Sequence, residues 1–251
     1  MKTIKYLLGA LLMSLATMAN AQSTSNNLSI DFKAGANTSE YKRYYASFAS
    51  MVITTDMALS EDKEKARGIN FGLVKGKNIS NGKLPLFLEY GLEATWVRYH
   101  DEDTEENEDW YYSKIVTKDE LSINMVSLAI PLNVVYSISL MNGEYEVAPY
   151  AGLNVKVNVI GIAKDKSSET RYDGDRVVDE ESGTEKAHFF TKDDTDDSPA
   201  NRFQLGMNLG FNIYKGKYSF GYRFQPDFIK LYNEGIDVKS KTNFISLGVR
   251  F

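Results

Sequence analysis

Apolar and polar residues alternate along most of this 251-residue chain, and this alternation is the feature that most restricts its fold. The final segment reads NFISLGVRF, in which every second side chain is apolar. Strict alternation is typical of a β-strand with one dry face and one wet face. The pattern recurs in about eight segments, and helical periodicity is almost absent. We predict strands near residues 28–38, 68–79, 84–99, 122–140, 145–162, 201–213, 218–225 and 241–251.

Three short connections allow the faces of these strands to be tested from the sequence. The predicted hairpin turns are Asn81-Gly82, Asn142-Gly143 and Lys215-Gly216, dipeptides that favour tight turns. Residues directly opposite in a hairpin point to the same face, so a one-residue slip would oppose apolar to polar side chains. Every predicted pair is instead apolar. The pairs are Leu73 with Tyr90, Phe71 with Leu92, and Ile69 with Ala94; Ile138 with Val147, Val134 with Ala151, Leu132 with Leu153, Ile130 with Val155, and Leu128 with Val157; and Ile213 with Tyr218, Phe211 with Phe220, Leu209 with Tyr222, and Met207 with Phe224.

The opposite face of the same strands carries charged side chains, amides and glycines. A soluble lipocalin-like barrel would have the reverse arrangement, with apolar residues inside. Apolar residues outside, polar residues inside, and short turns alternating with long connections are typical of an outer-membrane barrel. We therefore predict an all-β fold, a transmembrane up-and-down antiparallel β-barrel of eight strands. The long connections, residues 39–67, 100–121, 163–200 and 226–240, are predicted to be extracellular loops, with both termini periplasmic.

The polar face is predicted to fill the barrel interior. An eight-stranded barrel is just wide enough to be filled by side chains, and unpaired charges there would be costly. The sequence therefore predicts a plugged lumen rather than an open pore. Pro131 and Pro149 fall within predicted strands, and we expect local bulges there because proline cannot donate to the ladder. The predicted interior polar network consists of Lys33, Glu89, Glu93, Lys156, Arg202, Arg223 and Arg250.

The N-terminal region has the features of a secretory signal peptide. Residues 1–21 combine two lysines, a short apolar run and a small-residue exit, too short a run to span a bilayer. We predict cleavage after Ala21, a short tail at residues 22–27 and the barrel at residues 28–251. The absence of cysteine excludes disulfides and a lipid anchor at the cleavage site. The net charge of -5 argues against a nucleic-acid partner.

The sequence contains few residues that could form a catalytic or metal-binding site. The two histidines, His100 and His188, fall in predicted outer loops; His100 has Asp101 and Asp103 beside it and Ser113 in the same loop, a set from which an acyl-transfer site could be built. The acidic runs DEDTEENED, YDGD and DDTDD could supply oxygen ligands to calcium, but they lack the spacing of an EF-hand. Solvated loops are the favoured interpretation of both. We therefore assign no catalytic, cofactor-binding or metal-binding residue, and no cofactor.

Two motifs resemble a known family. The stretch AIPLNVVYS, with Ile130, Pro131, Leu132 and Tyr136, is followed by APYAGLNV, with Pro149, Tyr150 and Gly152. Together they resemble the porin-family, PorT-like outer-membrane β-barrels of Bacteroidetes, one branch of which assists a secretion system. The resemblance implies an outer-membrane location in a Gram-negative bacterium. It also implies that the terminal aromatic residue, Phe251, is an assembly signal read by the outer-membrane assembly machinery.

These observations predict a non-enzymatic barrel that acts as a structural, adhesive or accessory subunit. Its partners would be outer-membrane lipid, the assembly machinery and an outer-membrane protein or surface ligand that contacts the loops. One alternative is a small porin-like channel. Others are a lipid-A-modifying enzyme and an accessory part of a secretion or assembly machine. The last predicted strand, residues 241–251, would close the barrel against residues 28–38.

Overall fold

A computed structural model describes residues 30–31, 38–57, 60–108, 114–173, 176–188, 190, 201–229 and 237–251. The predicted signal peptide, the tail at residues 22–27 and Lys33 lie outside the described residues. No helix in the described part is long and apolar enough to cross a membrane. The elements are β1 (Ile30–Asp31), β2 (Glu40–Met57), β3 (Ser60–Asn78), β4 (Leu86–Glu108), β5 (Lys114–Tyr136), β6 (Ile138–Leu140), the 3-10 turn η1 (Met141–Gly143), β7 (Tyr145–Asp173), β8 (Arg176–His188), β9 (Phe203–Lys215), β10 (Tyr218–Pro226) and β11 (Asp237–Arg250).

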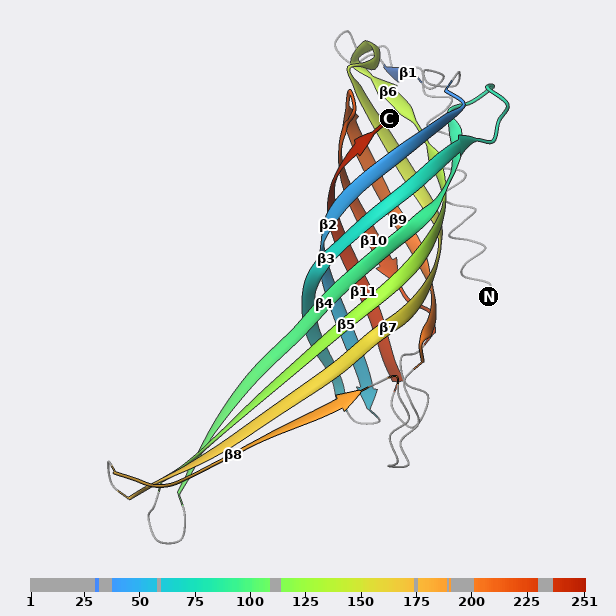
Figure 1. Ribbon diagram of the computed structural model, residues 1–251. Coiled ribbons are helices and arrows are strands. Elements are labelled where there is room, and N and C mark those ends of the chain that lie inside the picture. Colours follow the sequence, from blue (N-terminus) through green and yellow to red (C-terminus); the bar gives the residue numbers. More distant parts are fainter. Residues whose placement is uncertain are drawn as a thin grey trace.

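Eight of these strands form a closed antiparallel ring. The order is β2, β3, β4, β5, β7, β9, β10 and β11, and β11 pairs with β2 to complete it. Neighbours in the ring follow one another along the chain, so the topology is up-and-down (Figure 1). The predicted fold class is confirmed. Closure leaves no free edge along the ring, because each strand has a neighbour on both sides.

The first strand of the ring differs from the prediction. β11 pairs with β2 from Arg250 opposite Arg43 to Asp237 opposite Asp56, not with residues 28–38. Residues 40–57 and 60–67, which were predicted as part of a loop, form β2 and the first part of β3, and the described part of 28–38 contributes β1, which pairs with β6 outside the ring. The sequence YKRYYASFAS conceals its alternation, because its tyrosines occupy both faces: Tyr41 and Tyr45 are buried, whereas Tyr44 is exposed.

The hairpin registers agree with the predicted faces, and one of them agrees in detail. Around Asn142-Gly143 the five predicted pairs are confirmed, from Ile138 opposite Val147 to Leu128 opposite Val157. The other two registers are displaced by two residues: Leu73 lies opposite Leu92, and Phe220 opposite Ile213. A two-residue displacement keeps every side chain on its face. The residues of the three turns with positive φ are Asn81, Gly82, Met141, Asn142, Gly143 and Gly216.

The predicted bulges at the prolines are wrong. Pro131 lies opposite Asn154 and Pro149 opposite Phe211 without a shift of register. Each proline instead lies beside a gap in the pairing. The β4–β5 ladder passes from Tyr90–Leu132 to Glu93–Ala129 without intervening pairs, so Pro131 has no partner on β4. Near Pro149, the pairing with β7 is interrupted between the end of β5 and the start of β6. Within the described pairing of β5 with β7, the irregularity lies between Val126 and Ser127.

The two faces of the wall have opposite character. Outward side chains such as Phe71, Leu92 and Leu247 are large, apolar and exposed, as lipid contact requires. Inward side chains are mainly polar and buried, and Tyr214, Phe244 and Met51 occupy the space between them. The interior is thus a packed polar core inside an apolar wall.

Three strands continue far beyond the ring. β4, β5 and β7 extend past the barrel, and β8 pairs with the outer part of β7 from Ile162 opposite His188 to Asp173 opposite Arg176. Figure 1 shows this four-stranded sheet, which we call the extension, leaning away from the end of the barrel opposite the C-terminus. Much of the predicted loops 100–121 and 163–200 is therefore strand. Their alternation is not visible in the sequence because both faces of the extension are polar.

Candidate functional site: a filled lumen and an extended sheet

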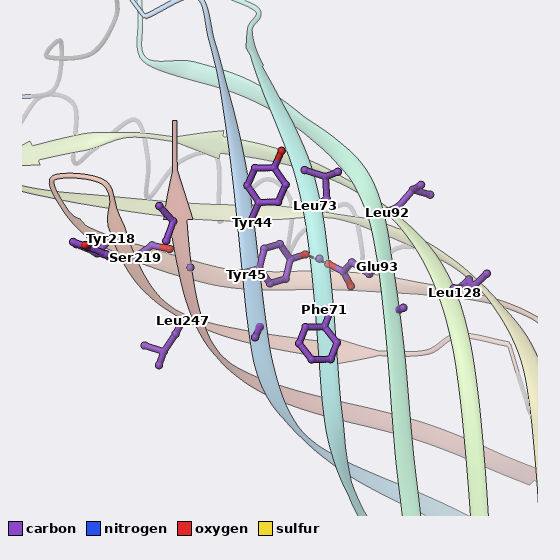
Figure 2. A pocket seen from close by; sticks show the side chains of 15 residues that line it. Tyr44, Tyr45, Phe71, Leu73, Leu92, Glu93, Leu128, Tyr218, Ser219 and Leu247 are labelled. Atoms are coloured by element: carbon purple, nitrogen blue, oxygen red, sulfur yellow. Dashed lines mark hydrogen bonds between the residues drawn. The ribbon is translucent and has the colours of Figure 1, made fainter.

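A buried ion pair between Glu93 and Arg223 crosses the middle of the lumen. The Arg223 Nη2 donates to Glu93 Oε2 at 2.8 Å, and Nη1 donates to Oε1, so the pair is bidentate. The Tyr45 hydroxyl also donates to Glu93 from β2. Figure 2 shows the Tyr45 ring pointing from β2 toward Glu93. The guanidinium of Arg223 stacks on Phe244, with Cζ 4.1 Å from the ring centroid, so charge and ring pack as one unit.

A second ion pair, between Arg43 and Glu89, lies one layer away. Arg43 Nη2 donates to Glu89 Oε1 at 3.0 Å, and the Tyr41 hydroxyl and the Asn133 amide also donate to this carboxylate, at 3.1 and 3.3 Å. Arg43 Nη1 reaches Asn212 Oδ1 at 3.2 Å. Glu89 is only 1% exposed, so these donors take the place of water around its charge.

Two further ion pairs lie toward the ends of the lumen. Lys156 Nζ is 2.5 Å from Asp227 Oδ2, and the Ser240 hydroxyl donates to the same oxygen. Arg250 forms a bidentate pair with Glu146, with both contacts at 2.5 Å. Its guanidinium also stacks on Tyr214, at 3.8 Å from the ring centroid. The lumen therefore carries ion pairs at several depths.

The predicted network is partly joined in the structure. Glu93 meets Arg223, as the sequence suggested, but Glu89 meets Arg43, which was placed in a loop. Lys156 and Arg250 pair with carboxylates outside the predicted set, and Arg202 donates to the Phe190 carbonyl at 2.6 Å. The sequence holds only a weak signal for Arg43, because the row of Tyr44, Ala46 and Phe48 on the outer face places Arg43 on the inner face, but tyrosines also lie on that inner face.

The outer wall is hollowed beside this network. An apolar groove of about 820 Å³ runs over β2, β3, β4 and β11, where Ala46, Gly72 and Gly248 lie among larger side chains. Figure 2 shows Tyr44, Leu73 and Leu92 standing out from neighbouring strands around it. Gly72 is required for close packing, because a Cβ there would lie 2.1 Å from Tyr45 Cζ. In a membrane this groove faces lipid acyl chains.

The extension presents free strand edges. β8 pairs with β7 on one side, and all thirteen of its residues are exposed. β4 has its last contact with β3 at Arg98, so beyond that residue its other edge is also unpaired in the described part of the chain. Carboxylates outnumber basic side chains on β8 and on β4 beyond Arg98, whereas the outer parts of β5 and β7 carry equal numbers of acidic and basic side chains. An exposed edge offers backbone donors and acceptors to another strand.

His100 lies at the base of the extension in a polar cluster. Its Nδ1 is 2.9 Å from the Ser122 hydroxyl and its Nε2 is 2.9 Å from Glu102 Oε1. A hydroxyl, an imidazole and a carboxylate are thus in series, as a nucleophile, base and orienting group would be. The backbone amides around Ser122 belong to the ladders with β4 and β7, so they are not arranged as an oxyanion hole. Ser113, the serine that the sequence placed in the same predicted loop as His100, lies outside the described residues.

Ion pairs also cross the faces of the extension. Lys166 Nζ is 2.5 Å from Glu120 Oε2, and the hydrogen bond from Lys166 lowers the pKa of Glu120. Lys114 Nζ is 2.8 Å from Glu106, whose hydrogen bond raises the pKa of Lys114. These groups are open to solvent, so each pair contributes little to stability.

The remaining predicted sites are placed as follows. Phe251 exchanges backbone hydrogen bonds of 2.9 Å with Lys42, and its exposed ring packs edge-on against Tyr44 at 6.1 Å. Across the described residues, no group of three or more histidines or carboxylates could hold a metal ion. The DDTDD run and part of YDGD fall outside the description.

Comparisons with solved structures find membrane barrels of low similarity. The attachment invasion locus protein Ail of Yersinia pestis is 16% identical, with 85% of this chain and 100% of that chain covered and a TM-score of 0.33. Neisserial surface protein A is 13% identical, with coverages of 83% and 97% and a TM-score of 0.35. The translocator domain of the autotransporter NalP from Neisseria meningitidis is 10% identical, with coverages of 100% and 98% and a TM-score of 0.26.

The sequence itself identifies the family. No curated protein sequence matches the chain. The model of the outer membrane protein beta-barrel domain matches residues 20–233, which include most of the ring and the whole extension. This match agrees with the closed ring, the apolar wall and the polar interior described above. The chain therefore belongs to the outer membrane protein β-barrel domain family.

Proposed function

We propose that this outer-membrane barrel is a non-enzymatic binding protein, an adhesive or accessory subunit that holds a partner on its extension. The observation that carries the proposal is β8, a strand of thirteen exposed residues that pairs, within the described part of the chain, with β7 alone. The barrel serves as the rigid anchor, since its lumen is filled by ion pairs. The extension would then project from the cell surface, with both termini in the periplasm.

The free edge of β8 suits an extended segment of another protein. Strand addition gives affinity through backbone hydrogen bonds and specificity through side chains on alternate positions. Asp179, Glu180 and Glu181 lie on this edge strand, so the partner segment should carry lysine or arginine. A second copy of the extension fits poorly, because its acidic edge would repel the first.

A synthetic peptide tests this proposal. A ten-residue peptide in which lysine alternates with threonine should bind the folded protein, as measured by fluorescence anisotropy in detergent. Replacing Asp179, Glu180 and Glu181 by Asn and Gln should weaken binding at least about tenfold, since three attractive charges are lost. Equal replacement of Asp119, Asp165 and Glu169, which lie on β5 and β7 with neighbouring strands on both sides, is the matched control and should leave binding unchanged.

The backbone contribution is tested separately. A peptide of the same sequence with N-methyl groups on alternate residues keeps its charge but cannot form a ladder. We expect it to lose most of its affinity. Equal binding of the two peptides would show that only charge attracts the peptide, and the strand-addition proposal would fail.

A transport channel is the first rival function. Ion pairs at several depths argue for a plugged lumen, since an ion would have to separate or pass buried charge pairs. Purified protein in a planar bilayer should therefore show no stable single-channel steps. Reproducible steps that change with Arg223→Gln would replace the anchor role by a pore.

A lipid-A-modifying enzyme is the second rival function. The series of Ser122, His100 and Glu102 is the observation that favours it. The lack of an arranged oxyanion hole around Ser122 weighs against it. An unchanged lipid A profile in cells that carry His100→Ala is the expected result, and a lost modification would establish the enzyme.

The partner class follows from the family resemblance. The motifs around Pro131 and Pro149 resemble porin-family, PorT-like barrels of Bacteroidetes, one branch of which assists a secretion system, and this resemblance supports an accessory role in a larger machine. Affinity purification from native outer membrane, with and without the acidic residues of β8, would test this role. We expect one co-purified protein to be lost when those residues are replaced. Outer-membrane lipid and the assembly machinery, the other expected partners, should be retained.

A further inference from the structure

Two arginines face each other on neighbouring strands at the point where the extension leaves the barrel. Arg67 on β3 lies directly opposite Arg98 on β4, and this is the last pair of their ladder. Both side chains are exposed and point outward. Like charges directly opposite each other in a sheet are destabilising. A doubly contacted anion would turn this repulsion into a binding site.

The surroundings of the pair contain hydrogen-bond donors and cations. Ser50 lies opposite Arg67 on one side, and Asn124 lies opposite Arg98 on the other. Lys65 is two residues from Arg67 on the same outward face. Among the side chains that the structure describes, neither guanidinium forms an ion pair with a carboxylate. The patch is therefore positive, although the extension beyond it is acidic.

The position of the pair relates it to the membrane surface. The preceding outward pair on the same strands is Ile69 opposite Trp96, two large apolar side chains that are each more than 40% exposed. Tryptophan is enriched where the apolar belt of a barrel meets the lipid headgroups. Two residues further along the strands, about 7 Å, the wall changes from this apolar pair to Arg67 and Arg98. The arginines thus lie at the depth of the headgroups.

We propose that Arg67 and Arg98 form a clamp for the phosphorylated headgroup of a membrane lipid. Each planar guanidinium can donate two parallel hydrogen bonds to phosphate oxygens, and the phosphate charge removes the repulsion between the arginines. The acyl chains of the same lipid would lie along Ile69 and Trp96 on the wall below. The clamp does not depend on the partner-binding role of β8. It would fix one lipid at the base of the extension.

Wild-type protein gives the first test. Phosphatidic acid and diacylglycerol with identical acyl chains are offered to the folded protein in nonionic detergent, and native mass spectrometry counts the lipids retained. We expect retention of phosphatidic acid at least about tenfold above diacylglycerol, because a charge-assisted bidentate contact is among the strong hydrogen bonds. Equal retention of the two lipids would overturn the proposal without any variant.

Variants then locate the phosphate. Arg67→Gln with Arg98→Gln should abolish the preference for phosphatidic acid, whereas Arg67→Lys with Arg98→Lys should retain part of it, since charge remains and the planar fork is lost. The matched control removes two arginines from the extension, Arg171→Gln with Arg176→Gln, and should retain the wild-type preference. Heat-modifiable migration verifies that each variant is folded. A preference that survives in the glutamine variant, or falls equally in the control, contradicts the clamp.

Inorganic phosphate distinguishes a lipid headgroup from a free anion. The headgroup site should keep its phosphatidic acid when inorganic phosphate is present in large excess, because the acyl chains add apolar contact that the free ion lacks. Displacement at comparable concentrations would overturn the lipid assignment in favour of a free-phosphate site.

Discussion

β4, β5 and β7 each pass through two environments, the barrel wall and the extension, and the same backbone geometry serves both. In the wall, one face of each strand meets lipid and the other meets a dry polar interior. In the extension both faces are open to water, and side chains along β8 are exposed without exception. Ion pairs occur in both regions, but their surroundings differ. The comparison teaches that burial, rather than the number of ion pairs, decides which of them hold the protein together.

The largest expected effect comes from breaking a buried pair in the wall. Glu93→Ala leaves the Arg223 guanidinium without its carboxylate and also removes the acceptor of the Tyr45 hydroxyl. The free energy of unfolding should fall by about 3–5 kcal/mol, the usual cost of an uncompensated buried charge. Urea titration of the protein in lipid vesicles, followed by tryptophan fluorescence, measures the change.

The matching variant in the extension should have no such effect. Glu120→Ala removes the partner of Lys166, but both groups remain in water, so the urea midpoint should stay at its wild-type value. Replacing both members of the buried pair, Glu93→Met with Arg223→Met, should recover most of the lost stability, since apolar groups need no partner. A double variant as unstable as Glu93→Ala would show that the pair itself, not the orphaned charge, stabilises the wall.

A pair of glycines sharpens the comparison at somewhat smaller magnitude. Gly72 in β3 has the Tyr45 ring where its Cβ would be, at 2.1 Å, whereas nothing lies within 4 Å of that position at Gly183 in β8. Gly72→Ala should cost about 1–3 kcal/mol, because Tyr45 must move from Glu93. Gly183→Ala should be neutral. Equal urea midpoints for the two variants would mean that the interior around Tyr45 is loosely packed and has room for a methyl group at residue 72.

The same contrast explains which elements the sequence could predict. In the wall, one apolar face against one polar face produces strict alternation, so β9, β10 and the hairpin around Asn142 could be recognised from the residues alone. In the extension both faces are polar, and HDEDTEENE has no alternation to recognise, although it forms the end of β4. β2 was missed for a second reason, because tyrosines lie on both of its faces.

The candidate site was predictable to a similar extent. The carboxylates Glu89 and Glu93 could be assigned to the interior, since their strand alternates clearly. Their partners depend on barrel stagger, which sequence spacing does not determine, so Arg43 replaced the predicted cations at Glu89. Asp227 was assigned to a loop because it follows Pro226 at the end of β10, where alternation stops. The opposition of Arg67 and Arg98 required the observed register.

The seam between β2 and β11 allows a smaller effect to be measured. Phe251→Ala removes the edge-on contact with Tyr44 and leaves the two backbone hydrogen bonds with Lys42 intact. We expect a loss of about 0.5–1.5 kcal/mol, the range for an aromatic pair. Slower acquisition of heat-modifiable migration in cells, beyond what this loss explains, would support an additional role of Phe251 in assembly. Wild-type assembly kinetics would count against that role.

The smallest expected effect concerns acid and the extension. The pKa of Glu120 is lowered from its ordinary value of 4.5 by the hydrogen bond from Lys166, so the folded extension binds this proton less readily than the unfolded chain. The ionised Glu120 carboxylate therefore contributes its full stabilisation of the extension above pH 4.5. This stabilisation is lost as the pH falls through the lower pKa of the folded state. Backbone amide exchange in residues 114–124, corrected for intrinsic rates, should accelerate on acidification below about pH 4.5.

Lys166→Met should remove this part of the acid response, because the hydrogen bond that lowers the pKa of Glu120 is then absent. Exchange in the variant should be faster than wild type at neutral pH and should converge with it under acid. Residues 128–136 of the same strand lie in the wall, where the Lys166 substitution should leave exchange unchanged. If Lys166→Met accelerated exchange there as well, the extension and the barrel would open as one cooperative unit rather than as two regions of a shared strand.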